Sequence, residues 1–222
     1  MSTPCASLSM TLISLAMKQP ETLPRKTGRP LSFDRDDVLE KAMLAFWESG
    51  YETTSISDLT AAMGVTAPSL YAAFGNKQQL FLEAMRLYAG DRAGLEQAMR
   101  AAPTARQAVT DMLRGAAVLY TGETTPRGCL LASAAATGSP DAAEVRIAVA
   151  AERRAIRGML IRRIEADIAQ GHLMPETPAT VLADLAIAVT QGMSVLSRDG
   201  ADRSSLLAVA DAATASWANY EV

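Results

Sequence analysis

The residues best suited to contact another molecule stand at the start of a short helix expected over residues 67–74. Its exposed N-terminal positions are expected to be Thr66, Ala67, Ser69 and Tyr71. Leu70 and Phe74 are four residues apart, so they share a face that can pack against a neighbouring helix. Hydroxyl groups and an aromatic ring placed in this way can contact the phosphates and base edges of DNA. The sequence shows no convergent set of acid, base and nucleophile, so we expect no enzymatic activity.

Two capped helices joined at a glycine must hold these residues in place. Ser55 can cap the first helix, and Asp58 follows three residues later, where its carboxylate can reach back to the open amide. Gly64 suits the left-handed conformation at a helix end. Thr66 can then cap the second helix, whose first turn contains Pro68. This arrangement predicts a helix-turn-helix, in which the second helix enters the major groove of DNA.

A helix on each side completes the predicted DNA-binding domain. Asp34 can cap a preceding helix that ends at Gly50. Asn76 can cap a following helix, which begins at Lys77 and keeps its apolar period to about Met99. We therefore expect a three-helix DNA-binding domain and a fourth helix that connects it to the rest of the chain.

This stretch resembles the TetR-type transcriptional regulators. The matching residues are Phe46, Gly50, Tyr51, Thr53, Thr54, residues 56–59, Gly64, Val65, Leu70, Tyr71, Phe74, Lys77 and Leu80. The resemblance covers roughly residues 29–82, and the combined spacing is specific. Many members carry Lys or Arg early in the second helix of the motif, whereas this chain reads TAPSLYAAF. The resemblance therefore does not extend to base reading by charged side chains.

The resemblance implies a set of DNA-contacting residues. They are Arg29, Thr53, Thr54, Thr66, Ala67, Pro68, Ser69, Tyr71 and Lys77. Thr53 and Thr54 would bind a phosphate near a helix N-terminus, unless they serve in capping alone. Tyr71 would stack on a sugar or a thymine methyl group, unless it is a half-buried core residue. Lys77 would hold a phosphate, although exposed lysines are usually only solvated.

Composition favours a helical protein in a reducing compartment. Hydrophobic residues make up 49% of the chain and the net charge is −3, so DNA binding needs a local basic patch. Cys5 and Cys129 are the only cysteines, which suits the cytoplasm. We expect no apolar run long enough to span a membrane, and nothing around the single histidine, His172, has the spacing of metal ligands. We expect an all-α fold of about nine helices, with no metal and no cofactor.

The N-terminal segment is basic and rich in proline. Its charged residues are Lys18, Glu21, Arg25, Lys26 and Arg29, which give +3 as four positive charges minus one negative. Such a segment can follow phosphates or the minor groove, or it can be a solvated tail. We expect a disordered arm over 1–28, a helix-turn-helix domain over 29–76, and a helical effector-binding and dimerisation domain over 77–222.

The resemblance implies that residues 80–222 bind an effector and form a dimer. Residues that can line an adaptable pocket, or simply fill the core, are Met112, Leu113, Tyr120, Cys129 and Met159. Helices expected over 178–197 and 204–220 carry apolar stripes that a symmetry mate can cover. The predicted interface residues are Leu185, Val189, Met193, Leu196, Leu206, Ala210 and Trp217.

These observations predict a transcriptional repressor that binds a near-palindromic operator of double-stranded DNA as a homodimer. A small-molecule effector would release it by favouring a conformer whose two recognition helices no longer fit successive major grooves. The alternatives are an activator, a regulator without a small-molecule ligand, a small helical enzyme and an adaptor that does not bind DNA. A redox or electrophile sensor is a further alternative, because Arg127 would favour the thiolate of Cys129. Leu130 and Leu131 argue instead for a buried structural thiol.

Overall fold

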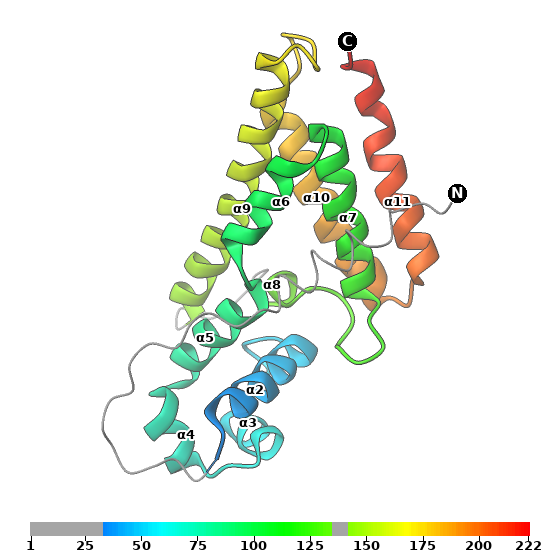
Figure 1. The fold of residues 1–222 in the computed structure, drawn as a ribbon. Coiled ribbons are helices and arrows are strands. Elements are labelled where there is room, and N and C mark those ends of the chain that lie inside the picture. The colour runs from blue at the N-terminus through cyan, green and yellow to red at the C-terminus, as the bar shows by residue number, and fades with distance from the viewer. Residues whose placement is uncertain (1–32, 135–141) are drawn as a thin grey trace. The chain divides into compact units, whose positions relative to one another are not determined.

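The computed structural model describes residues 33–134 and 142–222, which are helical apart from turns and one isolated β-bridge between Leu173 and Glu221. The helices are α2 (Arg35–Ser49), α3 (Ile56–Met63), α4 (Ala67–Phe74), α5 (Lys77–Ala89), α6 (Arg92–Ala101), α7 (Ala105–Tyr120), α8 (Leu130–Ser133), α9 (Ala143–Ala169), α10 (Ala179–Arg198), α11 (Arg203–Ala215) and the 3-10 turn η2 (Ser216–Asn219) (Figure 1). The all-α class expected from the sequence is confirmed. The expected arm over 1–28, together with Arg29, lies outside the described residues.

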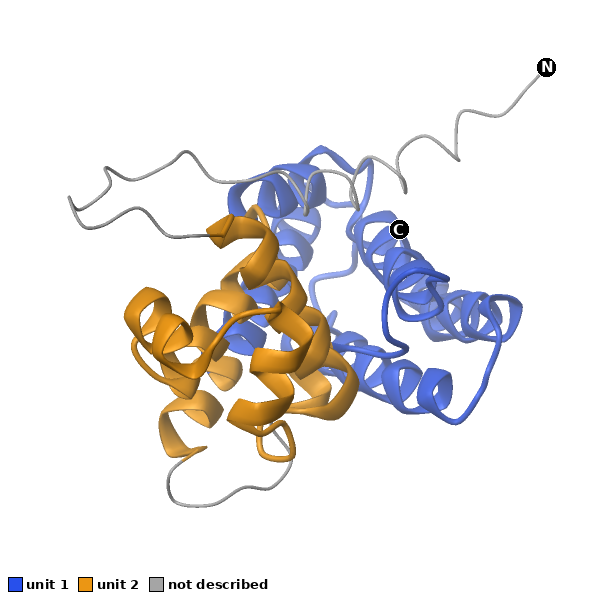
Figure 2. Cartoon of the chain, turned by 90° about the horizontal axis from the view of Figure 1, so that it is seen from below, with its two compact units in different colours: residues 1–16, 92–129, 151–222 blue, residues 17–91, 130–150 orange. Residues whose placement is uncertain are grey.

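The chain divides into two compact units (Figure 2). The helix-turn-helix unit contains α2 to α5 up to Asp91, together with the described residues of Leu130–Ala150. The C-terminal unit contains Arg92–Cys129 and Ala151–Val222. Helix α9 therefore contributes its first turns to one unit and the remainder to the other. The functional boundary expected between residues 76 and 77 stays a prediction.

An aromatic core holds the helix-turn-helix unit together. The ring centroids of Phe46 and Phe81 lie 5.1 Å apart, and Tyr51 lies 5.1 Å from Phe81, both pairs edge to face. Apolar residues buried around these rings are Val38, Ala42, Met43, Leu59, Met63, Leu70, Phe74, Leu80, Ala84 and Met85. Burying one such large side chain stabilises the fold by about 1.5–3 kcal/mol. This core packs α2 against α3 and α5, and α4 contacts both α3 and α5.

Helix α7 lies at the centre of the C-terminal unit. It packs against α6, α10 and α11, and α10 also packs against α11 (Figure 1). Leu113 of α7 is fully buried, as are Met193 of α10 and Leu206 of α11. Trp217 in η2 is 1% exposed and extends the same core. The apolar period of each helix therefore points one face toward its neighbours in the same chain.

A buried ion pair joins α9 to the turn between α6 and α7. The carboxylate of Asp167 accepts a hydrogen bond from the backbone amide of Ala105 at 2.6 Å and pairs with Arg163. Arg163 also donates to the carbonyl oxygens of Met99 at 3.1 Å and Ala102 at 3.0 Å. The Asp167 side chain is 1% exposed, so these contacts replace the water that its charge would otherwise require.

Two helix boundaries differ from those expected. The stretch expected as one helix from Lys77 to Met99 is divided at Gly90, whose φ of 63° and ψ of −149° favour glycine. The helix expected to reach Tyr220 ends at Ala215 and continues as a 3-10 turn. Helix ends depend on tertiary packing as well as on the local apolar period.

Helix α10 corrects the expectation about membrane-spanning segments. It is 20 residues long with a mean hydropathy of 1.6 over its most apolar window, so its length and composition would allow it to cross a membrane. Only 28% of that window is buried. One such helix is weak evidence for a membrane span, because helices that pack against other helices pass the same test. Helix α10 does have an exposed apolar face.

Candidate nucleic-acid interface

The turn between α3 and α4 is set by local hydrogen bonds. The Ser55 hydroxyl accepts from the Asp58 amide at 3.1 Å, and the Asp58 carboxylate accepts from the Ser55 amide at 2.8 Å. Gly64 ends α3 in the left-handed conformation, with φ 68° and ψ 30°. The side chain of Thr66 then caps α4 by accepting from the Ser69 amide. The predicted helix-turn-helix is therefore confirmed, including its capping box.

Helix α4 presents the residues expected to face DNA. Leu70 and Phe74 are buried, as their spacing indicates. Tyr71 is 47% exposed, so about half of its surface is open to solvent and to a DNA contact. Thr66 and Pro68 are exposed, and Ala67 and Ser69 are half-buried. Thr66 and Tyr71 are therefore exposed as expected, whereas Ala67 and Ser69 are partly covered.

The two threonines before α3 differ from each other. Thr54 is 2% exposed, and its hydroxyl donates to the carbonyl oxygen of Gly50 at 2.6 Å. The amide of Thr54 donates to the same carbonyl. Thr54 therefore has a structural role in the turn after α2, which corrects its assignment as a phosphate ligand. Thr53 is exposed and donates its hydroxyl to the Ser49 carbonyl oxygen.

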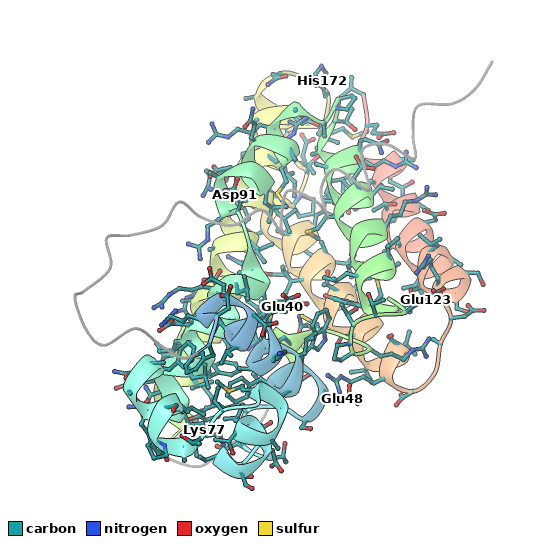
Figure 3. The ribbon with its side chains drawn as sticks, turned by 60° about the horizontal axis from the view of Figure 1, so that its bottom comes forward. Glu40, Glu48, Lys77, Asp91, Glu123 and His172 are labelled. Carbon is teal, nitrogen blue, oxygen red and sulfur yellow. The ribbon has the colours of Figure 1, made fainter. Side chains whose placement is uncertain are left out.

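Lys77 lies at the N-terminal end of α5 (Figure 3). Its ammonium nitrogen is 4.6 Å from the centroid of the Tyr51 ring and donates to the Glu52 carbonyl oxygen at 3.4 Å. Burial lowers the pKa of Lys77 below its usual value of 10.5, while the charges of Glu52 and Asp58 act in the opposite direction. A cation anchored at a helix N-terminus adds to the positive end of the helix dipole, and both attract a phosphate.

Arg35 is the other cation close to α4, and its guanidinium is already occupied. It pairs with the carboxylate of Glu83 at 2.7 Å and lies over the Phe74 ring, 4.4 Å from the centroid. It also donates to the Ala73 carbonyl oxygen at 3.4 Å. Arg35 therefore fixes the C-terminal end of α4 against α2 and α5. Sequence reasoning missed this contact, because nothing local links residues so far apart in the chain.

The predicted pocket residues are dispersed over the C-terminal unit. Leu113, Tyr120, Cys129 and Met159 are buried, whereas Met112 is half-buried. Of these residues, Met159 alone lines one of the two described cavities. That cavity, of about 350 Å³, is lined by Glu96, Met99, Arg100, Met159, Arg162, Arg163, Ala166 and Gln170. A second cavity, of about 380 Å³, lies between α7 and α11 and is lined by Thr104, Arg106, Gln107, Thr110, Asp211, Thr214 and Glu221.

The predicted dimer residues fall into two groups. Met193, Leu206, Ala210 and Trp217 are at most 1% exposed within the single chain. They cannot meet a second copy without unfolding, so their assignment to the interface is corrected. Leu185 and Leu196 are 42% and 43% exposed, and Val189 is half-buried. Val181 and Val195, which were not among the predicted interface residues, are 61% and 57% exposed on the same helix.

No group of three or more potential metal ligands occurs within residues 33–134 and 142–222. His172 follows the end of α9 (Figure 3), with Nδ1 3.8 Å from the buried carboxylate of Asp167. Its backbone amide donates to the Asp167 carbonyl oxygen at 2.9 Å. This position agrees with a role for His172 in ending the helix.

Known proteins share both parts of this architecture. Residues 38–84 match the family described as bacterial regulatory proteins, tetR family, and residues 103–213 match the tetracyclin repressor-like C-terminal domain. The chain is 32% identical over 209 residues to the HTH-type transcriptional repressor ComR of Escherichia coli K12, which covers 91% of this chain and 98% of ComR.

Solved structures agree with these matches. A cysteine mutant of the TetR family regulator CifR, complexed with 26-bp double-strand operator DNA, is 41% identical with a TM-score of 0.80, over 86% of this chain and 100% of that one. A putative TetR regulator from Rhodococcus sp. RHA1 is 36% identical with a TM-score of 0.58, over 83% of this chain and 98% of that one. The capped helix-turn-helix, the helical C-terminal unit and these relatives together show that this chain belongs to the TetR family of transcriptional regulators.

Proposed function

We propose that the protein is a transcriptional repressor that binds a near-palindromic operator as a homodimer. The observation that carries this proposal is the surface formed by α4 and the start of α5, where Tyr71 is exposed and Lys77 is anchored. The relative in complex with operator DNA and the relative named a repressor support it.

Selection of bound fragments from genomic DNA at physiological salt tests this function. We expect enrichment of a sequence with two half-sites about 34–36 Å apart, one turn of duplex DNA. Deletion of the gene should raise expression of the neighbouring target, whereas a fall in expression would indicate an activator. If no sequence is enriched, the protein is not an operator-binding regulator.

The dimer would form through the exposed faces of α10 and α11. Exposed residues of α10 with alternating spacings of four and three are Val181, Leu185, Ala188, Gly192 and Val195. This is the spacing of a helix–helix seam. Small exposed residues of α11 with spacings of three, four and three are Ser205, Ala208, Ala212 and Ala215. Small side chains allow two helices to approach closely, so a symmetric four-helix interface would cover the apolar surface that one chain leaves exposed.

The cavity between α6 and α9 supports an organic anion as the effector. Three arginines and one glutamate line it, and one of these arginines, Arg163, is already paired with the buried carboxylate of Asp167. Glu96 is shared, because it accepts from Arg100 at 2.8 Å and from Arg162 at 3.1 Å. Met99 and Met159 supply an apolar wall. A ligand with a carboxylate and a short apolar body would compete with Glu96 for the two arginines while covering the methionines.

Calorimetric titration with octanoate and with octanol tests this effector class. We expect octanoate to bind and to weaken operator affinity, and octanol to bind at least tenfold more weakly. Arg162→Gln should lower octanoate affinity, whereas the control Arg114→Gln, whose ion pair with Asp211 lies elsewhere, should not. Equal binding of both compounds, or equal effects of both substitutions, would place the effector elsewhere.

A second candidate function is sensing through Cys129, which is buried beside Tyr120. The Cys129 side chain is hydrogen-bonded with the buried hydroxyl of Tyr120, whose pKa is raised first by burial and then by Cys129. The Cys129 amide donates to the Ser194 hydroxyl at 2.9 Å. Peroxide would convert the thiol to a sulfenic acid with release of water, adding an oxygen atom where the chain touches α10.

A further inference from the structure

Apart from the hydroxyl group of Tyr71, the exposed residues of α4 present methyl groups, a proline ring and one aromatic ring. Pro68, Tyr71 and Ala72 are exposed, and no residue of Ala67–Phe74 carries a charge or an amide. We propose that this helix reads its operator mainly through the C5 methyl groups of thymines in the major groove. The inference rests on the proposed function and specifies which chemical groups of the operator are recognised.

The hydroxyl groups at the start of α4 are used within the protein. The oxygens of Thr66 and Ser69 lie 2.9 Å apart in a hydrogen bond with each other. Thr66 also accepts from the Ser69 amide at 3.4 Å, which caps the helix. One of the two hydroxyl hydrogens is used in this bond and the Thr66 oxygen is held by the cap, so contacts within the protein set the orientation of both side chains. The methyl group of Thr66 takes no part in these hydrogen bonds.

The cations beside α4 are engaged in contacts within the protein. Arg35 is held by the carboxylate of Glu83 and by the ring of Phe74. Lys77 is held by the Tyr51 ring and the Glu52 carbonyl oxygen, at the helix N-terminus where a phosphate is favoured. Neither cation is therefore placed to form the bidentate contact with guanine that Arg and Lys make in many operators.

The amide side chains that follow α4 are also engaged. The Asn76 side chain accepts from the Gln79 amide at 2.8 Å as the cap of α5. Gln78 donates to the carboxylate of Glu144. The side-chain amide of Gln79 lies against Gly75. Adenine is usually read by a bidentate Asn or Gln, and all three such residues near α4 make other contacts.

Thymine methyl groups are the base feature that remains for this surface. They project into the major groove, and Ala side chains, Thr methyl groups and aromatic rings pack on them. Removing a methyl group from water contributes about a threefold to fivefold gain in affinity. Several thymines in each half-site would therefore give useful specificity without a charged base contact, while phosphate contacts supply most of the affinity.

Replacement of each thymine by deoxyuridine tests the inference on the selected operator. This change removes the C5 methyl group and keeps every hydrogen-bonding atom. We expect fluorescence anisotropy to show that operator affinity falls by about threefold to fivefold on substitution of each of at least two thymines per half-site. Replacement of each guanine by 7-deazaguanine, which lacks the N7 acceptor, should change affinity less than twofold.

Variants of the protein link the effect to α4. Tyr71→Ala should lower operator affinity and abolish the sensitivity to deoxyuridine at one thymine position, and Tyr71→Phe should keep that sensitivity. Lys77→Ala should weaken binding to all duplexes by the same factor. The ratio of the affinities for the thymine and deoxyuridine duplexes should therefore stay unchanged at every position. The folded state of each variant is checked by its thermal unfolding.

Two outcomes separate failure of this inference from failure of the proposed function. If the protein binds its operator specifically but no deoxyuridine substitution lowers the affinity, recognition of thymine methyl groups is overturned and operator binding stands. A large loss on 7-deazaguanine substitution also overturns it, because a protein donor would then be reading guanine. An absence of any enriched operator overturns the proposed function itself.

Discussion

The ammonium nitrogen of Lys77 lies 4.6 Å from the centroid of the Tyr51 ring. Tyr51 belongs to the buried aromatic core through its edge-to-face contact with Phe81. The cation at the start of α5 is therefore positioned by the core of the same unit. A phosphate bound there would meet a charge that is already oriented, which reduces the entropy lost on binding.

Loss of the Lys77 charge should weaken DNA binding by the same factor on every sequence. Lys77→Gln removes one phosphate contact in each half-site, so the slope of log affinity against log salt should become shallower by about 0.9 for each phosphate lost. Lys41→Gln is the matched control, because Lys41 is an exposed cation paired with Asp37 on α2. An unchanged salt slope for Lys77→Gln would show that Lys77 does not touch phosphate.

A charge on the exposed face of α10 should separate the dimer. Leu185→Glu places a carboxylate in a seam that would bury more than about 2,000 Å² in an obligate dimer. Sedimentation at low micromolar concentration should show a monomer that binds operator weakly. Ile147→Glu adds the same charge at an apolar residue of α9 that is 64% exposed, and this control should stay dimeric. A dimeric Leu185→Glu protein would move the interface away from α10.

Removal of the buried Asp167 carboxylate should strongly destabilise the C-terminal unit. Asp167→Ala leaves Arg163 buried without its ion pair and the Ala105 amide without its acceptor, at a cost of about 3–5 kcal/mol. Asp211→Ala removes an exposed partner of Arg114 and should cost no more than about 1 kcal/mol. Urea unfolding of both variants measures the difference, and similar midpoints would contradict this account of the buried ion pair between Arg163 and Asp167.

The Ser55–Asp58 capping box should lose its contribution in acid. The Ser55 side-chain hydrogen bond, aided by the bond from the Ser55 amide, holds the pKa of Asp58 below its usual value of 3.8. A depressed carboxyl pKa gives stability that is complete above the unfolded-state pKa and is lost as pH falls through the folded-state pKa. The difference in urea midpoint between wild type and Asp58→Asn should therefore be constant from pH 7 to about pH 5 and shrink below 3.8.

Oxidation should release the protein from DNA only if Cys129 acts as a sensor. Mild peroxide should then add one oxygen atom to Cys129, detected by mass spectrometry, and Cys129→Ser should keep its operator affinity under the same treatment. Tyr120→Phe removes the hydroxyl next to the thiol and should change the rate of modification. Equal release of wild type and Cys129→Ser by peroxide would leave Cys129 with a structural role alone.

The DNA-binding elements could be predicted from the sequence because local hydrogen bonds define them. The capping box at Ser55, the left-handed Gly64 and the cap at Thr66 each join residues a few positions apart. Such contacts depend little on the rest of the fold, so residue type and spacing predict them. The buried positions of Leu70 and Phe74 followed from the same helical period.

The sequence alone determined the all-α class, the helix-turn-helix and the apolar faces of α10 and α11. Only the tertiary structure decided that Met193 and Trp217 face the chain's own core while Leu185 and Val195 remain exposed. It also decided that Thr54 is buried and that Arg35 forms an ion pair with Glu83. An apolar stripe in the sequence indicates which residues are favoured in contact with other apolar groups. Which neighbour covers each of them depends on packing between segments far apart in the chain.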